Sequence, residues 1–189
     1  MRYSERITTM QSSPIRKLAP IASSAKAKGI KIYHLNIGQP DIKTPKVFFE
    51  AVKNFNNEVL EYAVSPGLPE LISSLQQYYT TYNMDFESDE ILVTNGGSEA
   101  LLFALMATCD PKDNILVPEP FYSNYNGFSQ SINVNITPIT TKAEEGFHLP
   151  SKEKIQSLIT SKTKAILISN PGNPTGTVYT KKNFTWFQK

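Results

Sequence analysis

The chain has 189 residues, of which 40% are hydrophobic and 19% are charged, and its formal net charge is +2. This length suits one domain, or a domain and part of another, and the small net charge gives no reason to expect a nucleic-acid or membrane partner. A single cysteine, Cys109, excludes an internal disulfide, and the sequence contains neither a signal-peptide pattern nor an apolar run of roughly 20 residues, so we expect a cytoplasmic protein.

The first half of the sequence is predicted to be mostly helical. Residues 1–12 have the character of a flexible arm. Ser13 and Pro14 then suit the N-cap and the first position of a helix, which Gly29 ends. An alternating segment, read as a strand, and two segments with helical apolar spacing follow at residues 31–37, 47–55 and 71–82.

The most informative stretch covers residues 91–102. It begins with a β-branched run at 91–94, typical of a buried strand, and turns at Gly96 and Gly97 into a helical apolar pattern. Ser98 is a suitable N-cap, and Glu99 places an acid in the first turn. A strand, a glycine turn and a helix N-terminus together indicate an anion site, because the glycines permit close approach and the N–H groups face the ligand.

The second half of the sequence predicts three further strands, at residues 114–118, 132–139 and 165–169. It also predicts a helix at residues 151–158, which Ser151 caps. The alternation of strands and helices predicts an α/β domain with a mainly parallel sheet. The last strand leads into Asn-Pro-Gly-Asn-Pro-Thr-Gly at residues 170–176, a stiff loop at the end of a strand where open α/β sheets bind ligands.

The motifs at 96–101 and 170–176, with two others at 38–41 and 62–71, resemble the fold-type I pyridoxal-phosphate (PLP) aminotransferases of the aspartate aminotransferase class. The resemblance runs from about Pro14 to Tyr179. It implies an N-terminal arm and small-domain segment at 1–45 and an incomplete PLP-binding large domain at 46–189, whose sheet is mixed in the full family and flanked by helices. It also implies transfer of an amino group between an amino acid and a 2-oxo acid, and a homodimer in the full-length enzyme.

The resemblance also assigns cofactor-binding residues. In the family the glycine turn holds the PLP phosphate, which corresponds here to Gly97, Ser98 and Glu99. An aromatic ring stacks on the pyridine, and alignment on Pro120 selects Tyr122, with Phe121 and Tyr125 as alternatives. The family's loop asparagine, which bonds the 3-hydroxyl oxygen of PLP, corresponds to Asn173. Cis peptides precede two family prolines, and Glu119–Pro120 and Asn173–Pro174 match them.

Two further residues are assigned by the earlier motifs. Gly38 matches the glycine that lies against the substrate α-carboxylate. Tyr62 matches the tyrosine whose hydroxyl reaches the cofactor phosphate of the other subunit. Ile72 stands where family members usually carry an arginine.

No catalytic residue is assigned, and no metal site is expected. The family's Schiff-base lysine and pyridine-nitrogen acid follow the Asn-Pro-Thr-Gly loop, and the residues after Gly176 include no Asp or Glu. Lys152 follows a serine but precedes the loop, so it does not match. No arginine occurs after Arg16 to bind a substrate carboxylate. We therefore expect an N-terminal portion of an aminotransferase, from a truncated or frameshifted product, with little or no activity by itself.

Three other readings remain open. A carbon–sulfur lyase or related fold-type I PLP enzyme uses the same motifs. A catalytically inactive fragment could bind PLP or dimerise. An unrelated protein could bind a nucleotide phosphate at Gly96, Gly97 and Ser98, although the sequence has neither a Gly-x-Gly-x-x-Gly motif nor a Gly-Lys-Ser/Thr motif.

Overall fold

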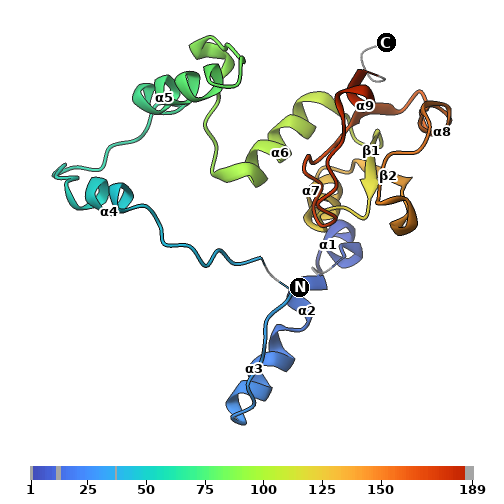
Figure 1. The fold of residues 1–189 in the computed structure, drawn as a ribbon, viewed down its shortest axis with the longest axis horizontal. Helices are drawn as coiled ribbons and strands as arrows, with labels where there is room; N and C mark the ends of the chain where they lie inside the picture. The colour runs from blue at the N-terminus through green and yellow to red at the C-terminus, as the bar shows by residue number, and fades with distance from the viewer. Residues whose placement is uncertain (1, 12–13, 37, 186–189) are drawn as a thin grey trace. The chain divides into compact units, whose positions relative to one another are not determined.

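The computed structural model describes residues 2–11, 14–36 and 38–185 (Figure 1). These residues form two compact units. One comprises the chain up to Ala19 and from Gly97 onward, and the other comprises Pro20–Gly96. The division of the chain into domains at residue 45 stays a prediction.

The first unit contains a three-stranded parallel sheet of β1 (Asn114–Glu119), β2 (Asn135–Thr140) and β3 (Thr163–Ile166), in the order β2-β1-β3. Strand β1 pairs in register with β2, Ile115 opposite Ile136, and pairs on its other side with β3. The parallel sheet predicted from the sequence is therefore confirmed.

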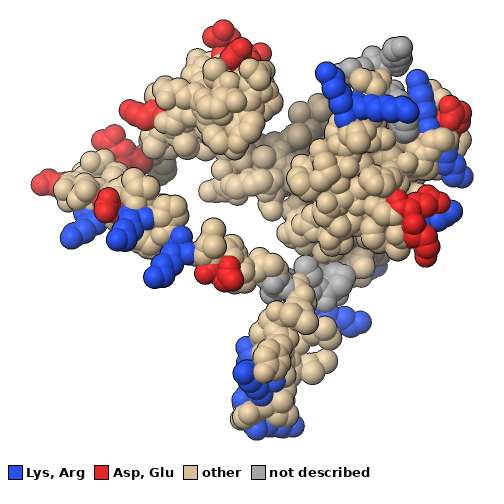
Figure 2. All heavy atoms as spheres, viewed as in Figure 1, with Lys and Arg blue, Asp and Glu red and all other residues tan. Residues whose placement is uncertain are grey.

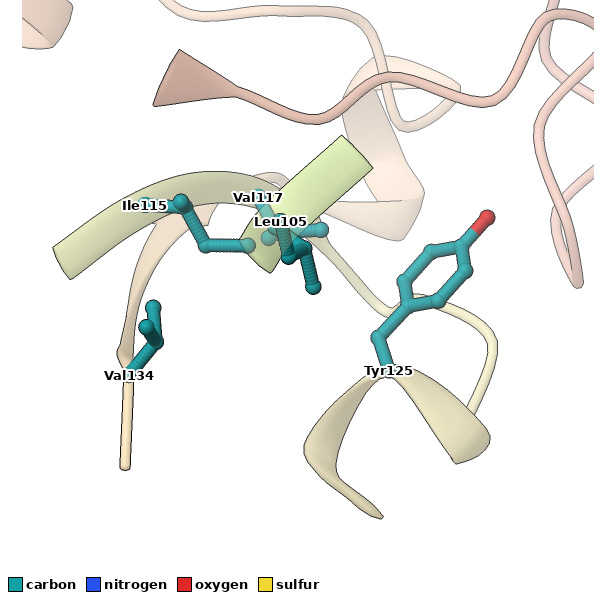
Figure 3. Packing of buried hydrophobic residues seen from close by; sticks show 5 residues of the cluster. All are labelled: Leu105, Ile115, Val117, Tyr125 and Val134. Atoms are coloured by element: carbon teal, nitrogen blue, oxygen red, sulfur yellow. The ribbon is translucent and has the colours of Figure 1, made fainter. Parts of the chain in front are cut away.

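The central strand explains where the core lies. Ile115, Leu116 and Val117 are almost fully buried, because successive residues of β1 point to opposite covered faces. Ile115 and Val117 pack with Leu105 and Val134 and with a tyrosine, Tyr125, on one face (Figure 3). On the opposite face, a second cluster consists of Leu116, Ile139, Leu149, Ile155 and Tyr179.

Helices contribute to both clusters. Leu105 belongs to α6 (Gly96–Thr108) and Tyr125 to α7 (Asn124–Ser131), so these helices pack on the first face. Ile155 of α8 (Lys152–Gln156) packs on the other face. The remaining short elements of the unit are α1 (Glu5–Thr9), α2 (Pro14–Lys17), η2 (Ala143–Glu145) and α9 (Lys181–Thr185).

The outer edge of β3 pairs with no other strand in the part of the chain that the structure describes. A groove of about 830 Å³ runs beside it, and its apolar walls include Ile155, Ile159, Ile166, Ile168 and Phe184. We call this feature the β3 groove.

The second unit consists of helices and irregular chain. Its elements are α3 (Ala19–Ala27, which begins at the unit boundary), α4 (Lys46–Lys53), α5 (Pro69–Thr80) and η1 (Ser88–Glu90). Ile72 of α5 is buried, an environment in which an arginine would need a charged partner. The Gln76 side chain of α5 donates a hydrogen bond to the carbonyl of Phe86 (2.8 Å), which holds α5 against the segment that follows it.

The charged side chains are dispersed in small groups of both signs in the view of Figure 2, with broad uncharged areas between them. Among the described residues, no helix has the length and apolar character that crossing a membrane requires.

Two strand predictions are wrong for the described residues. Residues 31–36 and 91–94 are irregular, and Ile37 lies outside the described part of the chain. A strand exists only where a neighbouring strand accepts its ladder of hydrogen bonds. Val93 instead donates its N–H to the carbonyl of Pro66 (2.8 Å), a single contact rather than a ladder.

Other boundaries differ because local capping decides them. The arm at 1–12 contains α1, whose N-cap Ser4 accepts a hydrogen bond from the N–H of Ile7. Ser13, the predicted cap of the next helix, lies outside the described residues. Helix α6 begins at Gly96, so Ser98 stands inside the first turn and is not the N-cap. The helices predicted at 47–55 and 71–82 are confirmed within two residues as α4 and α5.

Candidate functional site

The glycine turn leads directly into the longest helix of the described chain. Gly96 has a φ of +75°, which suits glycine, and its N–H donates to the carbonyl of Thr94 (2.7 Å). Gly97 and Ser98 then lie exposed in the first turn of α6. The first N–H groups of a helix have no acceptor within it, and they carry the positive end of the helix dipole. A Cβ atom on Gly97 would meet no other heavy atom within 4 Å, so a ligand can approach the backbone here. The turn has the chemistry of an anion site.

Aromatic residues follow the carboxyl end of β1. The Glu119–Pro120 bond is cis, as predicted. Tyr122 is half-buried, its hydroxyl accepts a hydrogen bond from Asn124 Nδ2 (2.6 Å), and its ring lies edge-on to Tyr125 at a centroid distance of 5.5 Å. Phe121 stacks on Tyr125 at 6.1 Å. Tyr125 is buried in the core, whereas the rings of Phe121 and Tyr122 are partly exposed.

The loop after β3 is tightly folded. The Asn173–Pro174 bond is cis as predicted, and the Asn170–Pro171 bond, which was not predicted, is cis as well. Inside the loop, the Gly172 N–H donates to the carbonyl of Thr177 (2.8 Å), and the Gly176 N–H donates to the carbonyl of Gly172 (2.7 Å). Asn173 lies exposed between these bonds.

The loops after β1 and β3 meet around a small cavity of about 20 Å³. Glu119, Pro120 and Phe121 line it from the first loop, and Gly172 and Asn173 line it from the second. This space holds about one water molecule. The cavity is therefore too small to be a ligand pocket, and it marks the place where the two loops pack together. We call this contact between the loops the joint.

Hydrogen bonds from β2 and its loop fix the first side of this joint. Thr140 Oγ1 donates to the Glu119 carboxylate (2.9 Å), and Thr141 Oγ1 donates to the Glu119 carbonyl (2.6 Å). Tyr179 also lines the cavity, and burial raises the pKa of its phenol above the ordinary value. Its hydroxyl therefore stays protonated at neutral pH and does not act as a base there.

The structure brings some of the sequence-predicted residues together and not others. Asn173 adjoins the loop that carries Tyr122, although Tyr122 itself does not line the cavity. Gly97, Ser98 and Glu99 belong to the same unit as both, but they do not line this cavity. Gly38 and Tyr62 belong to the other unit, where both are exposed. No group of His, Cys, Asp and Glu that could hold a metal ion occurs within the described ranges.

Sequence reasoning missed two features of this edge. Helix α7 follows directly after Tyr122, but its polar sequence with Gly127 lacks a clear apolar stripe. The sequence predicts only a stiff loop around Asn170, whose side chain accepts a hydrogen bond from the N–H of Tyr179 (2.9 Å). The repeated Asn-Pro pair at 170–174 was the available signal.

Comparison with known proteins gives consistent matches. The sequence model of the aminotransferase class I and II family matches residues 30–186. A probable aspartate aminotransferase of Methanocaldococcus jannaschii is 35% identical over 181 residues, which cover 95% of this chain and 46% of that protein. The crystal structure of an aspartate aminotransferase from Thermotoga maritima superposes with a TM-score of 0.90 at 32% identity, covering 98% of this chain and 50% of that one. The alanine aminotransferase of Pyrococcus furiosus gives 0.87 at 34% identity, covering 98% and 48%. The chain thus spans about half the length of the relatives it matches.

Proposed function

This chain belongs to the class I and II aminotransferase family, and we propose that it forms the cofactor-holding part of a PLP-dependent aminotransferase. The reaction moves an amino group between an amino acid and a 2-oxo acid. The observation that carries the proposal is the joint between the loops after β1 and β3, with Asn173 exposed beside the loop that carries Tyr122. Ligands of open α/β sheets bind at this carboxyl edge of the strands.

The first turn of α6 and the loops after β1 and β3 carry donors that suit PLP, which supplies an electron sink for chemistry at the amino-acid α-carbon. The open first turn of α6 suits its phosphate, and Gly97 and Ser98 contribute N–H groups there. Glu99 would contribute its backbone N–H, because its carboxylate would repel a phosphate. The half-buried ring of Tyr122 offers a surface for the pyridine, and the Asn173 amide can donate to the 3-hydroxyl oxygen.

Two residues of the other unit complete the proposal. Gly38, at which a Cβ would meet no other atom within 4 Å, would lie against the α-carboxylate of the substrate. Tyr62 is fully exposed, and its hydroxyl would reach the cofactor phosphate of the other subunit in a homodimer.

We expect the 189-residue chain by itself to turn over little or no amino acid. It has no arginine after Arg16, and a bidentate carboxylate clamp is poorly replaced by lysine. It also has no Asp or Glu after Gly176 to hold the pyridine nitrogen. For these 189 residues taken alone, the second candidate function is cofactor binding without turnover.

Calorimetric titration of the purified chain with pyridoxine 5′-phosphate tests the proposal. This analogue has the ring, the hydroxyl and the phosphate of the cofactor but no aldehyde, so it cannot react with surface lysines. We expect saturable binding, weakened about tenfold by Tyr122→Ala and little changed by Tyr122→Phe, which keeps the ring and loses only the bond from Asn124.

Pyridoxine without the phosphate is the matched ligand control and should bind more weakly. Equal binding of the two ligands, or an equal loss in both Tyr122 variants, would contradict the proposed site. A parallel assay of amino-acid turnover with PLP separates the two candidate functions, because turnover by this chain would exclude binding without catalysis.

A further inference from the structure

The residues between Asn170 and Tyr179 form a closed loop. Tyr179 lies at the end of the loop and is held in place, because the residue is only 7% exposed and packs in the cluster with Leu116 and Ile139. Asn170 begins the loop, and its Oδ1 accepts the N–H of Tyr179 at 2.9 Å. This side-chain bond joins the two ends of a segment that carries Asn173 near its middle.

Inner contacts make the loop stiff once its ends are joined. Gly172 and Thr177 are bridged by a backbone hydrogen bond of 2.8 Å, and the hydroxyl of Thr177 donates to the carbonyl of Gly146 (2.9 Å) outside the loop. A Cβ atom on Gly172 would lie 2.6 Å from Thr175 Oγ1, so the turn is closely packed. Displacement of one end would therefore be transmitted to Asn173.

We propose that Asn170 is a positioning residue for Asn173. Resting on the proposed function, the inference is that the Asn170 side chain acts through the N–H of Tyr179 and does not touch the cofactor. It holds Asn173 where its amide meets the hydroxyl oxygen of a phosphorylated pyridine ring. Position 170 therefore requires a short side chain whose terminal oxygen can accept the N–H of Tyr179.

This requirement gives a matched pair of variants. Asn170→Ala removes the acceptor, and Asn170→Asp keeps an acceptor oxygen at the same distance along the side chain. Hydrogen exchange of the Tyr179 amide reports the bond without any ligand. We expect exchange about fivefold faster in Asn170→Ala and close to wild type in Asn170→Asp.

Titration with pyridoxine 5′-phosphate provides the second readout. We expect the Kd to rise severalfold in Asn170→Ala and in Asn173→Ala, and to stay near the wild-type value in Asn170→Asp. Asn173→Ala should leave the exchange of the Tyr179 amide unchanged. Circular dichroism of each variant confirms that the fold is retained.

The outcomes separate the inference from the proposed function. Unchanged Tyr179 exchange in Asn170→Ala would overturn the loop closure, and faster exchange with an unchanged Kd would overturn the positioning role. Failure of the wild-type chain to bind the analogue would overturn the proposed function and the cofactor half of the inference, while the exchange data would still decide the closure.

Discussion

The carboxylate of Asp113 lies 3.8 Å from Nζ of Lys162, and this contact links the residue before β1 to the residue before β3. Asp113 is 2% exposed, and its Oδ2 also accepts the N–H of Asp110 (2.9 Å). Two backbone bonds tie the same corner, from Asn114 to the Lys162 carbonyl and from Asn135 to the Asp113 carbonyl. The amino ends of all three strands therefore meet around one buried carboxylate.

Asp113→Ala should lower the free energy of unfolding by about 1–3 kcal/mol, because it leaves the Asp110 N–H without its acceptor. Asp113→Asn should cost less, since an amide oxygen can still accept that bond. Lys162→Ala should cost under about 1 kcal/mol, because the Lys162 side chain is 66% exposed and such pairs are weak. Urea unfolding followed by circular dichroism measures all three, and an equal loss in the lysine variant would mean that the ion pair dominates.

The second prediction concerns alkaline pH. Burial raises the pKa of the Tyr179 phenol above its ordinary value, so the folded state favours the protonated form. The resulting contribution to stability is complete below about pH 10 and is lost as the pH rises through the folded-state pKa. Tyr179→Phe keeps the ring and removes the titration. The difference in unfolding free energy between wild type and variant should therefore be constant from pH 7 to 9 and change above about pH 10. A difference that varies between pH 7 and 9 would contradict this origin.

The sequence predicted correctly those strands that have a clear apolar pattern and a neighbouring strand to pair with. The run Ile115-Leu116-Val117 is apolar at every position because both faces of β1 are covered, and a continuous apolar run is the signature of such a strand. Residues 91–94 have a similar composition, but no described segment pairs with them, and composition cannot report a missing partner. Helix α7 shows the converse case. Its sequence is weakly patterned, and its burial comes from the contact of Tyr125 with β1.

The candidate site could likewise be predicted from the sequence only in its local features. The loops followed from their proline and glycine content, and two of the three cis peptides followed from the family resemblance at Pro120 and Pro174. The bond between Asn170 and Tyr179 did not, because it depends on how the chain returns nine residues later. The roles of Gly97, Ser98, Glu99, Tyr122, Asn173, Tyr62 and Gly38 toward a cofactor or substrate stay predictions.

The third prediction separates a ligand effect from a folding effect at the first turn of α6. Gly97→Ala adds a methyl group where no heavy atom lies within 4 Å, and in a helix alanine is favoured by up to about 1 kcal/mol. The fold should therefore be unharmed, while the methyl group would occupy the space through which a phosphate approaches. The Kd of pyridoxine 5′-phosphate should rise severalfold. Gly127→Ala in α7 is the matched control, since it is also a helical glycine with open space around its Cβ and should leave the Kd unchanged.

The last prediction concerns the β3 groove, which places apolar side chains beside the unpaired edge of β3. An edge strand next to apolar surface is a site of self-association, and a charge placed there opposes it. Ile159 lines this groove and is 49% exposed, so Ile159→Lys can place its ammonium group in water without emptying the core. Sedimentation velocity over a concentration series should show less association for this variant than for wild type. Val178→Lys is the control, because Val178 is 58% exposed and does not line the groove, yet the change adds the same charge. Equal effects of the two variants would assign the change to net charge, and the groove would then have no part in association.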